Sequence, residues 1–250
     1  MRVIRSLPLL LALLAVASSA HAARGVFLRW DHCYADGGVQ NKNFACDTNA
    51  GSETLVGGFE TNADYPNVSG NEVIINLVSA GSPLPAWWLM RSVGTCRQTA
   101  LAMNTANSGV NCTDWAAGLS FGGIGAYNIG QRGPNTARLV MALAVQPQQI
   151  QSLHPGQEYF SFNVTINHTK TVGPGACAGC STPVCIVLES INVTTTSYTH
   201  LTQGPTNGID NDWVTWQGGG GIVGIGGQTG CPAATPTVLH TWGEVKALYR

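Results

Sequence analysis

Ser120 lies in a stretch whose pattern matches a nucleophile motif. Gly118-Leu119-Ser120-Phe121-Gly122 has the G-x-S-x-G spacing of the α/β-hydrolase elbow, where a serine hydroxyl attacks an ester or amide carbon. Residues that could complete a triad follow in the chain order of that fold: Asp210, Asp212 and His240. The elbow requires a helix directly after the serine, and Gly122-Gly123-Ile124-Gly125 is a poor helix former. A secreted serine hydrolase using Ser120 is therefore the alternative, and a glycine-rich β connection is the favoured interpretation.

The cysteines could carry redox, metal or structural chemistry. There are eight of them: Cys33, Cys46, Cys96, Cys112, Cys177, Cys180, Cys185 and Cys231. One C-x-x-C spacing occurs, but a thioredoxin-like site needs a βαβ context and a zinc site needs reduced thiolates. An even number in an exported chain indicates disulfides instead. Short spacing favours the pairs Cys33–Cys46 and Cys96–Cys112, and the remaining four cysteines allow three connectivities.

No metal or cofactor site is predicted. Gly219-x-Gly221-x-x-Gly224 matches the dinucleotide fingerprint formally, but glycines and Cys231-Pro232 follow where a helix is needed. The acidic stretch 208–212 does not fit an EF-hand loop, and Asp and Asn are ordinary in turns. The histidines form no H-x-x-x-H or related ligand pair. We therefore expect neither a metal nor a cofactor.

Tryptophan is the more suggestive residue for binding. Trp87 and Trp88 are adjacent, and on a strand they would point to opposite faces. One of them, with Trp213 and Trp216, is then a candidate platform for a sugar ring or a partner protein. The alternative is that both faces are covered, one by a second sheet and one by a loop. We favour the covered arrangement and keep the four tryptophans as candidate ligand-binding residues.

The first 22 residues have the pattern of a secretory signal peptide. Arg2 and Arg5 precede the apolar run Leu9–Val16, and Ala20-His21-Ala22 is a cleavage site of the A-x-A type. The apolar run is shorter than the roughly 20 residues that span a bilayer. We expect cleavage near Ala22, no transmembrane segment, and a secreted protein (extracellular or periplasmic) with one β-rich domain over residues 23–250.

The composition is that of a globular, β-rich chain. Of 250 residues, 44% are hydrophobic and only 10% are charged, and 31 are glycine. Few Glu, Lys and Arg with many Gly favour strands and turns over helices. The formal net charge is −1, and losing Arg2 and Arg5 makes the exported chain more acidic. This charge provides no electrostatic footprint for nucleic acid or for anionic lipid.

Alternating polarity predicts the strands that would form this domain. The clearest is Phe160–Asn167, where Phe160, Phe162, Val164 and Ile166 should face the core. Other expected strands are Val26–Trp30, Glu72–Val78, Trp87–Arg91, Arg138–Val145, Val184–Val193, Tyr198–Thr202 and Trp213–Trp216. The apolar phase changes at Glu189-Ser190, which predicts a bulge or bend. Short strands separated by Gly and Pro turns predict an all-β fold, an antiparallel β-sandwich that is jelly-roll-like or Ig-like.

Helix signals are few. Arg97–Met103 is the best candidate within the body of the chain. The terminal segment 241–250 is the other, because Thr241 and Glu244 have capping-box spacing and apolar residues follow at spacings of three and four. We expect a short C-terminal helix that docks on the domain or serves as a sorting tail.

The same terminal segment carries a resemblance. Thr241-Trp242-Gly243-Glu244-Val245-Lys246-Ala247-Leu248-Tyr249-Arg250 resembles the T-W-G-x-V-K-x-L-Y-R ending of a group of exported bacterial proteins. The segment from Cys177 to Cys180, followed by Cys185-Ile186-Val187-Leu188, is similar to the same group. The resemblance implies bacterial export and a β-rich body, and it implies no activity.

Together these patterns predict a secreted or cell-surface, non-catalytic β-sandwich with a binding or structural role, whose partner is a cell-surface glycan or a protein. The alternatives are the serine hydrolase using Ser120 and a carbohydrate-binding module using exposed tryptophan.

Overall fold

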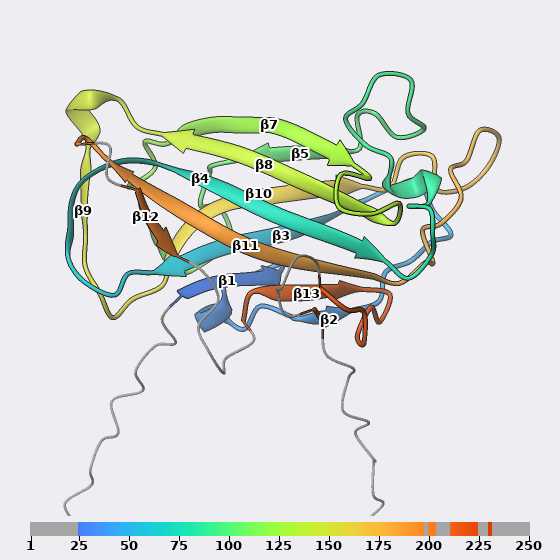
Figure 1. Ribbon diagram of the computed structural model, residues 1–250, viewed down its shortest axis with the longest axis horizontal. Coiled ribbons are helices and arrows are strands. Elements are labelled where there is room, and N and C mark those ends of the chain that lie inside the picture. The colour runs from blue at the N-terminus through green and yellow to red at the C-terminus, as the bar shows by residue number, and fades with distance from the viewer. Residues whose placement is uncertain (1–24, 198–199, 204–210, 225–229, 232–250) are drawn as a thin grey trace, which may run out of the picture.

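The computed structural model describes residues 25–197, 200–203, 211–224 and 230–231, and within them the chain forms a β-sandwich of two sheets (Figure 1). The expected signal peptide, the expected C-terminal helix and two residues of the candidate triad, Asp210 and His240, lie outside this part of the chain. Within it, no helix is long and apolar enough to cross a membrane.

The smaller sheet has five strands. Its order is β1 (Gly25–Trp30), β3 (Ser52–Glu60), β10 (Tyr159–Asn167) and β5 (Leu101–Asn104), all antiparallel, with β6 (Thr113–Asp114) pairing in parallel with β10.

The larger sheet has eight strands. Its order is β2 (Asn41–Lys42), β13 (Trp213–Trp216), β11 (Val184–Thr195), β4 (Tyr65–Ser79), β8 (Thr136–Ala144) and β7 (Phe121–Ile129). Two further strands pair outside this path: β12 (His200–Gln203) with β11, and β9 (Gln151–Leu153) with β4. The described helical segments are single 3₁₀ turns: η1 (Tyr34–Asp36), η2 (Ala86–Trp88) and η3 (Pro147–Gln149).

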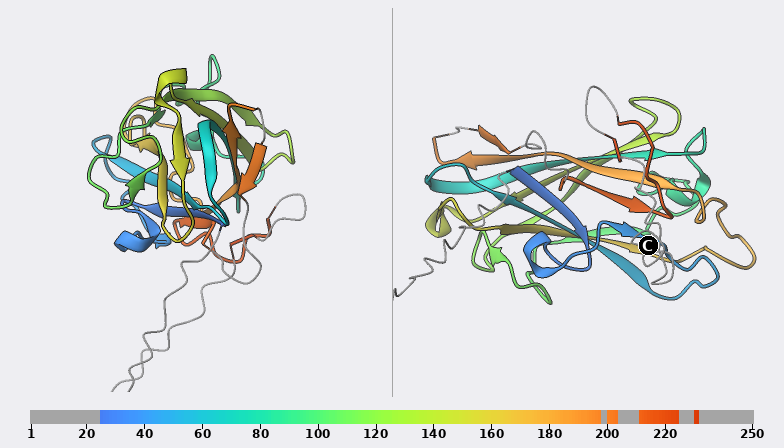
Figure 2. Two further views of the ribbon diagram at one scale, coloured as in Figure 1. Left: turned by 90° about the vertical axis from the view of Figure 1, so that its left-hand side faces the viewer. Right: turned by 90° about the horizontal axis from the view of Figure 1, so that it is seen from below.

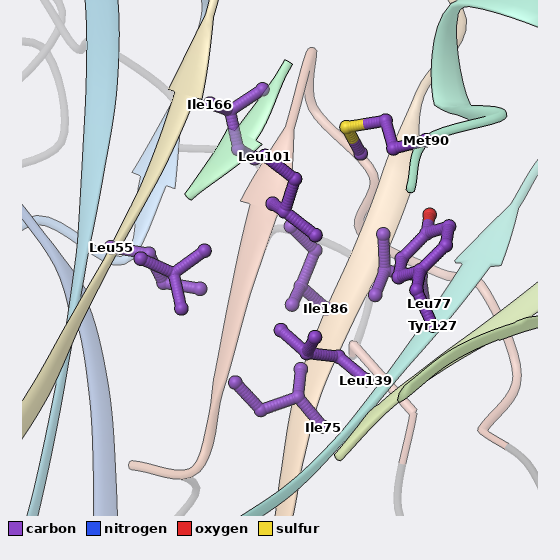
Figure 3. Close-up of a pocket in the computed structure, with 10 residues that line it drawn as sticks. Leu55, Ile75, Leu77, Met90, Leu101, Tyr127, Leu139, Ile166 and Ile186 are labelled. Atoms are coloured by element: carbon purple, nitrogen blue, oxygen red, sulfur yellow. The ribbon is translucent and has the colours of Figure 1, made fainter. Parts of the chain in front are cut away.

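The core lies between the two sheets, which enclose it when the molecule is seen end-on (Figure 2, left). Apolar side chains of both sheets leave a void of about 10 Å³ near Leu55, Ile75 and Leu139 (Figure 3). A void of this size holds at most one water molecule. The interior of the sandwich is therefore a packed core and not a ligand pocket.

Most of the predicted strands are confirmed. The expected strands at Val26–Trp30, Glu72–Val78, Arg138–Val145, Val184–Val193 and Trp213–Trp216 correspond to β1, β4, β8, β11 and β13. The pairing of β11 with β4 shifts between Leu188 and Ser190, so the predicted bulge is confirmed. The described part of Tyr198–Thr202 overlaps β12.

The predicted orientation of β10 is correct only in part. Phe162, Val164 and Ile166 lie in the main core, as expected. The pairing with β3 shifts between Phe160 and Phe162, so Phe160 joins a separate cluster with Cys33 and Val56. A bulge exchanges the two faces of a strand, and strict alternation in the sequence cannot reveal it.

Two predicted elements are wrong. Trp87–Arg91 begins in the 3₁₀ turn η2, which follows Pro85, and is not a strand. Arg97–Met103 is not a helix, because its second half enters β5, where it pairs with β10. In the first segment a buried site for the two indoles outweighs the weak local preference for a strand. In the second, pairing with β10 outweighs the weak local preference for a helix.

All eight cysteines form disulfides, but the predicted local pairs are wrong. The bonds join Cys33 to Cys112, Cys46 to Cys180, Cys96 to Cys177, and Cys185 to Cys231. Their sequence separations are 79, 134, 81 and 46 residues. Short spacing reflects only the ease of loop closure, whereas in the folded chain strand pairing places cysteines that are distant in sequence side by side.

Candidate functional site

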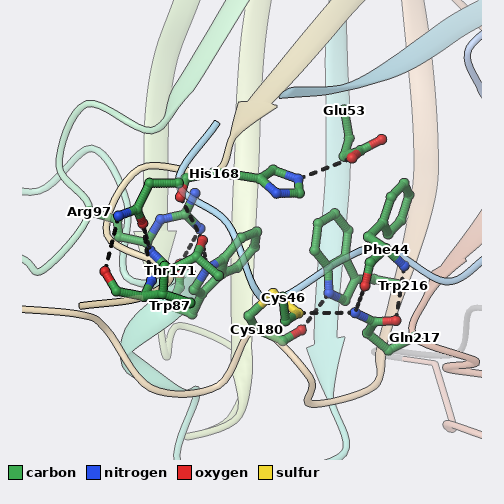
Figure 4. The surroundings of a disulfide bond; sticks show 12 residues. Phe44, Cys46, Glu53, Trp87, Arg97, His168, Thr171, Cys180, Trp216 and Gln217 are labelled. Carbon is green, nitrogen blue, oxygen red and sulfur yellow. Dashed lines mark hydrogen bonds and ion pairs between the residues drawn. A yellow bond between two sulfur atoms is a disulfide. The ribbon is translucent and has the colours of Figure 1, made fainter. Parts of the chain in front are cut away.

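The four candidate tryptophans are buried, as in the covered arrangement favoured from the sequence, so the alternative of an exposed platform is wrong. Trp87, Trp88 and Trp216 are 0% exposed and Trp213 is 5% exposed. The turn η2 directs both Trp87 and Trp88 into one cluster, with ring centroids 5.1 Å apart, instead of to opposite faces of a strand. The ring centroid of Trp216 lies 4.8 Å from that of Trp87 (Figure 4). It lies 5.3 Å from that of Trp88.

Two indole N–H groups of this cluster, those of Trp87 and Trp216, bind neighbouring loops. Trp87 Nε1 donates to Thr171 Oγ1 at 3.1 Å, and Trp216 Nε1 donates to the carbonyl oxygen of Cys180 at 2.7 Å. Trp213 packs apart from them, on the outer face of the larger sheet against Cys185 and Cys231. The indole N–H groups of Trp88 and Trp213 are buried without a hydrogen-bond partner among the described residues. All four tryptophans are structural, because their rings are buried in the protein itself.

Arg97 is a buried cation that clamps the same region. Its guanidinium donates to the carbonyl oxygens of Trp87, Asn167 and Thr169. The Arg97 Cζ atom lies 3.5 Å from the centroid of the Trp87 ring, within cation–π range. Burial lowers the pKa of Arg97 to about 10. All these partners are neutral, so Arg97 is a fixed donor for the loop backbone.

A chain of charged groups leads from the surface to the aromatic cluster. Lys42 Nζ lies 2.6 Å from Asp31 Oδ2 and 3.5 Å from Glu53 Oε2. Glu53 Oε1 lies 3.0 Å from Nε2 of the buried His168, an ion-pair distance without the alignment of a hydrogen bond. The His168 ring is 6.3 Å from that of Trp216. With 3% of its surface exposed, His168 is not accessible to a substrate.

A second set of buried polar side chains, Arg29 and Glu158, lies beside η1. Arg29 donates to the backbone and side chain of Asn211, and burial lowers its pKa. Glu158 accepts hydrogen bonds from the backbone N–H groups of Tyr34 and Ala35 at 3.0 and 2.8 Å. Burial raises the pKa of Glu158, and those two hydrogen bonds oppose the rise. Glu158 also lies close to Cys33 and Cys112, but their sulfurs are joined and cannot bind a metal as thiolates.

Ser120 does not lie in a nucleophile elbow. Strand β7 follows it directly, where the hydrolase fold requires a helix. The Ser120 hydroxyl is buried and has no hydrogen-bond partner among the described residues, so no described base can activate it. The local structure is the glycine-rich β connection favoured from the sequence.

The C-x-x-C segment lines a shallow hollow at one end of the sandwich. The hollow has a volume of about 280 Å³ and is bordered by Cys46, Thr171 and the segment 176–181. Cys177 and Cys180 belong to different disulfides, so they do not form a C-x-x-C redox pair. The side chains that border the hollow are all uncharged.

The exposed apolar side chains were not singled out by the sequence. Leu119 and Phe121 are 43% and 58% exposed, and they lie at the start of β7. Strand β7 forms the edge of the larger sheet, and it is the longest edge strand in the described part of the chain. The many glycines between residues 118 and 130 concealed this strand, although the spacing of Ile124, Tyr127 and Ile129 toward the core is a weak signal for it.

Comparison with known proteins gives only distant superpositions on solved structures. No family model and no curated protein matches the sequence. A cohesin module from a Clostridium perfringens family 33 glycoside hydrolase superposes with a TM-score of 0.34 and 9% identity, over 77% of this chain and 93% of that one. The sixth cohesin of Acetivibrio cellulolyticus scaffoldin B, solved in complex with a Cel5 dockerin, gives 0.34 and 8% over 77% and 97%. The second type II cohesin of ScaA from the same organism gives 0.32 and 8% over 73% and 91%. Scores this low carry no argument about the fold, ligand or activity of this chain.

Proposed function

We propose that the protein is a secreted or cell-surface, non-catalytic β-sandwich module with a binding or structural role. The observation that supports this is that its cysteines and buried charged side chains hold the fold together. All eight cysteines are in disulfides, and the buried Arg29, Arg97 and Glu158 are bound to backbone groups. A protein whose loops are held by disulfides and buried hydrogen bonds is suited to remaining folded outside the cell.

The hydrolase alternative is tested with a fluorophosphonate probe on exported protein with its disulfides intact. We expect no labelling of Ser120, because its hydroxyl is buried and precedes a strand. Ser120→Ala is the test variant and Ser181→Ala, at an exposed position, is the matched control. Labelling that disappears only in Ser120→Ala would overturn the non-catalytic proposal.

The carbohydrate alternative is tested on a glycan array, followed by tryptophan fluorescence on any hits. Because the four candidate indoles are buried, a bound sugar cannot stack on them without opening the core. We expect no change in emission. A glycan that shifts the emission and leaves the thermal midpoint unchanged or higher would establish the carbohydrate-binding alternative.

A further inference from the structure

The two long sides of the sandwich differ in how their edges are closed. On one side, β1 lies beside β13, and its N–H groups are used: Leu28 N donates to Asn211 O and Trp30 N donates to Val39 O, both at 2.8 Å. On the other side lie β5 of one sheet and β7 of the other (Figure 1). These two strands are neighbours without pairing, and the hydrogen bond from Thr105 Oγ1 to Ser120 O links their ends.

Strand β7 has the features of an unprotected edge. Eight of its nine residues pair with β8 on one side, and no described strand pairs with its other side. Natural edge strands are blocked by charges, proline, shortness or bulges. β7 has neither a charged residue nor proline, and its only blocking feature is the bulge between Ile124 and Ala126. The other edge strands of the two sheets' main paths, β1, β5 and β2, are shorter.

The backbone of β7 is exposed at two glycines, and its outer face is open at a third. Gly122 and Gly125 are exposed, and a Cβ atom at Gly123 would meet nothing within 4 Å. Phe121 stands on the outer face at the start of the strand. Only an extended polypeptide can satisfy a row of alternating N–H and C=O groups, so the fitting partner is another β-strand.

We propose that β7 pairs in antiparallel fashion with β7 of a second copy of this chain, which joins two sandwiches through one continuous sheet. The added strand must be extended and unpaired on one side, and β7 of a second copy meets both conditions and brings no blocking charge or proline into the pair. A two-fold axis makes one such edge sufficient for both partners. The inference depends on the proposed binding or structural role and names the partner.

The faces of β7 determine the register of this pairing. Phe121, Gly123, Ala126 and Asn128 pair with β8 residues of the outer face, whereas Ile124, Tyr127 and Ile129 contact the core. Residues opposite each other in an antiparallel pair point to the same face. Phe121 therefore lies opposite Asn128 of the second copy, and Gly123 opposite Ala126, with the bulged Gly125 near the axis.

The test is the oligomeric state of the full exported chain, measured by size-exclusion chromatography with light scattering over a dilution series. We expect a dimer that dissociates on dilution, with β7 amides protected from hydrogen exchange in the dimer and unprotected in the monomer. Gly123→Lys should abolish the dimer, because it places a charge at the edge without a clash in the monomer. Ala142→Lys is the matched control, because Ala142 is the exposed partner of Gly123 on β8, one strand from the edge.

A wild-type chain that stays monomeric at every concentration would overturn the inference, as would a dimer that survives Gly123→Lys. Loss of the dimer in Ala142→Lys as well would place the contact on the sheet face and also overturn it. Each variant is first shown to have no free thiol and wild-type circular dichroism, so that misfolding is not read as dissociation. The proposed function fails separately, by specific labelling of Ser120.

Discussion

A single buried guanidinium connects its own segment to two others at one end of the sandwich. Arg97 reaches the backbone at Trp87, Asn167 and Thr169, and the adjacent Cys96 is bonded to Cys177. Arginine is suited to this position because its planar group has five donors and can stack on an indole ring. Lysine could not form the same set of contacts.

Replacing Arg97 with methionine should therefore destabilise the fold strongly. The substitution keeps much of the buried stem but leaves carbonyl groups without donors, which costs about 1–3 kcal/mol or more. Chemical denaturation with the disulfides intact measures the loss. Arg132→Ala is the control, because Arg132 forms a partly exposed ion pair with Glu189 at 3.4 Å, of a kind that contributes about 0–1 kcal/mol. Equal losses in the two variants would contradict the clamp.

Glu158 should give a pH dependence opposite to that of a typical paired carboxylate. Burial raises its pKa above the ordinary 4.5, so the folded protein binds this proton more tightly than the unfolded chain does. The contribution of Glu158 to stability is then fully present below pH 4.5 and is lost as pH rises through the folded pKa. Glu158→Gln lacks this loss, so the stability of the variant relative to wild type should increase over that window. The free energy of unfolding of both proteins is measured by chemical denaturation across this pH range. Wild-type and Glu158→Gln profiles that run parallel would show that the pKa of Glu158 is not raised by folding.

At the scale of the strands, Gly57 of β3 is fixed by its neighbour on β10. A Cβ atom at Gly57 would come within 2.0 Å of the Phe162 ring, which is itself fully buried. Gly57→Ala should therefore force the core apart and cost about 1–3 kcal/mol. Gly123→Ala, in the open space beside β7, should change stability little. Thermal unfolding of both variants checks the contrast, and a neutral Gly57→Ala would mean that Phe162 moves freely.

The strands that could be predicted are those in which the order of apolar and polar residues reflects which side chains are buried. In β11 the polar pair Glu189-Ser190 interrupts the apolar run that ends at Leu188, and alternation follows from Ile191, so even the bulge could be predicted. Strand β7 lacks such a pattern of apolar and polar residues, since glycine contributes no side chain to either face. The bulge at Ser161 was also undetectable, because both faces of β10 are covered there and burial no longer distinguishes them.

The tryptophans show the corresponding limit for the candidate site. The adjacency of Trp87 and Trp88 implies opposite faces only if the segment is a strand, and the turn at Pro85 removes that premise. Residue type indicated correctly that these side chains matter for packing. Whether they face solvent depends on loops distant in sequence, which one sequence does not specify.

For the whole molecule, the disulfides are a large source of stability that can be removed chemically. Each contributes about 2–4 kcal/mol on the chain-entropy account, and four together are comparable with the roughly 5–15 kcal/mol that stabilises a typical domain. Thiol titration of the denatured, unreduced chain should give none, and eight after reduction. The reduced and alkylated chain should lose its cooperative unfolding transition. A reduced chain that unfolds at the same midpoint would show that the two sheets suffice alone.

The arrangement of the four bonds has a consequence for a molecule exposed to proteases. The loops closed by Cys33–Cys112 and Cys46–Cys180 overlap and together enclose every peptide bond from Cys33 to Cys180, and Cys185–Cys231 encloses the bonds between its own ends. A single backbone cut anywhere in those spans leaves one covalent molecule, whose fragments become visible only after reduction. Between Cys33 and Cys231, the link 181–184 is the stretch where one cut separates the chain, and there Val184 is buried and paired in β11. A nicked population would therefore remain assembled and continue to present the same surface.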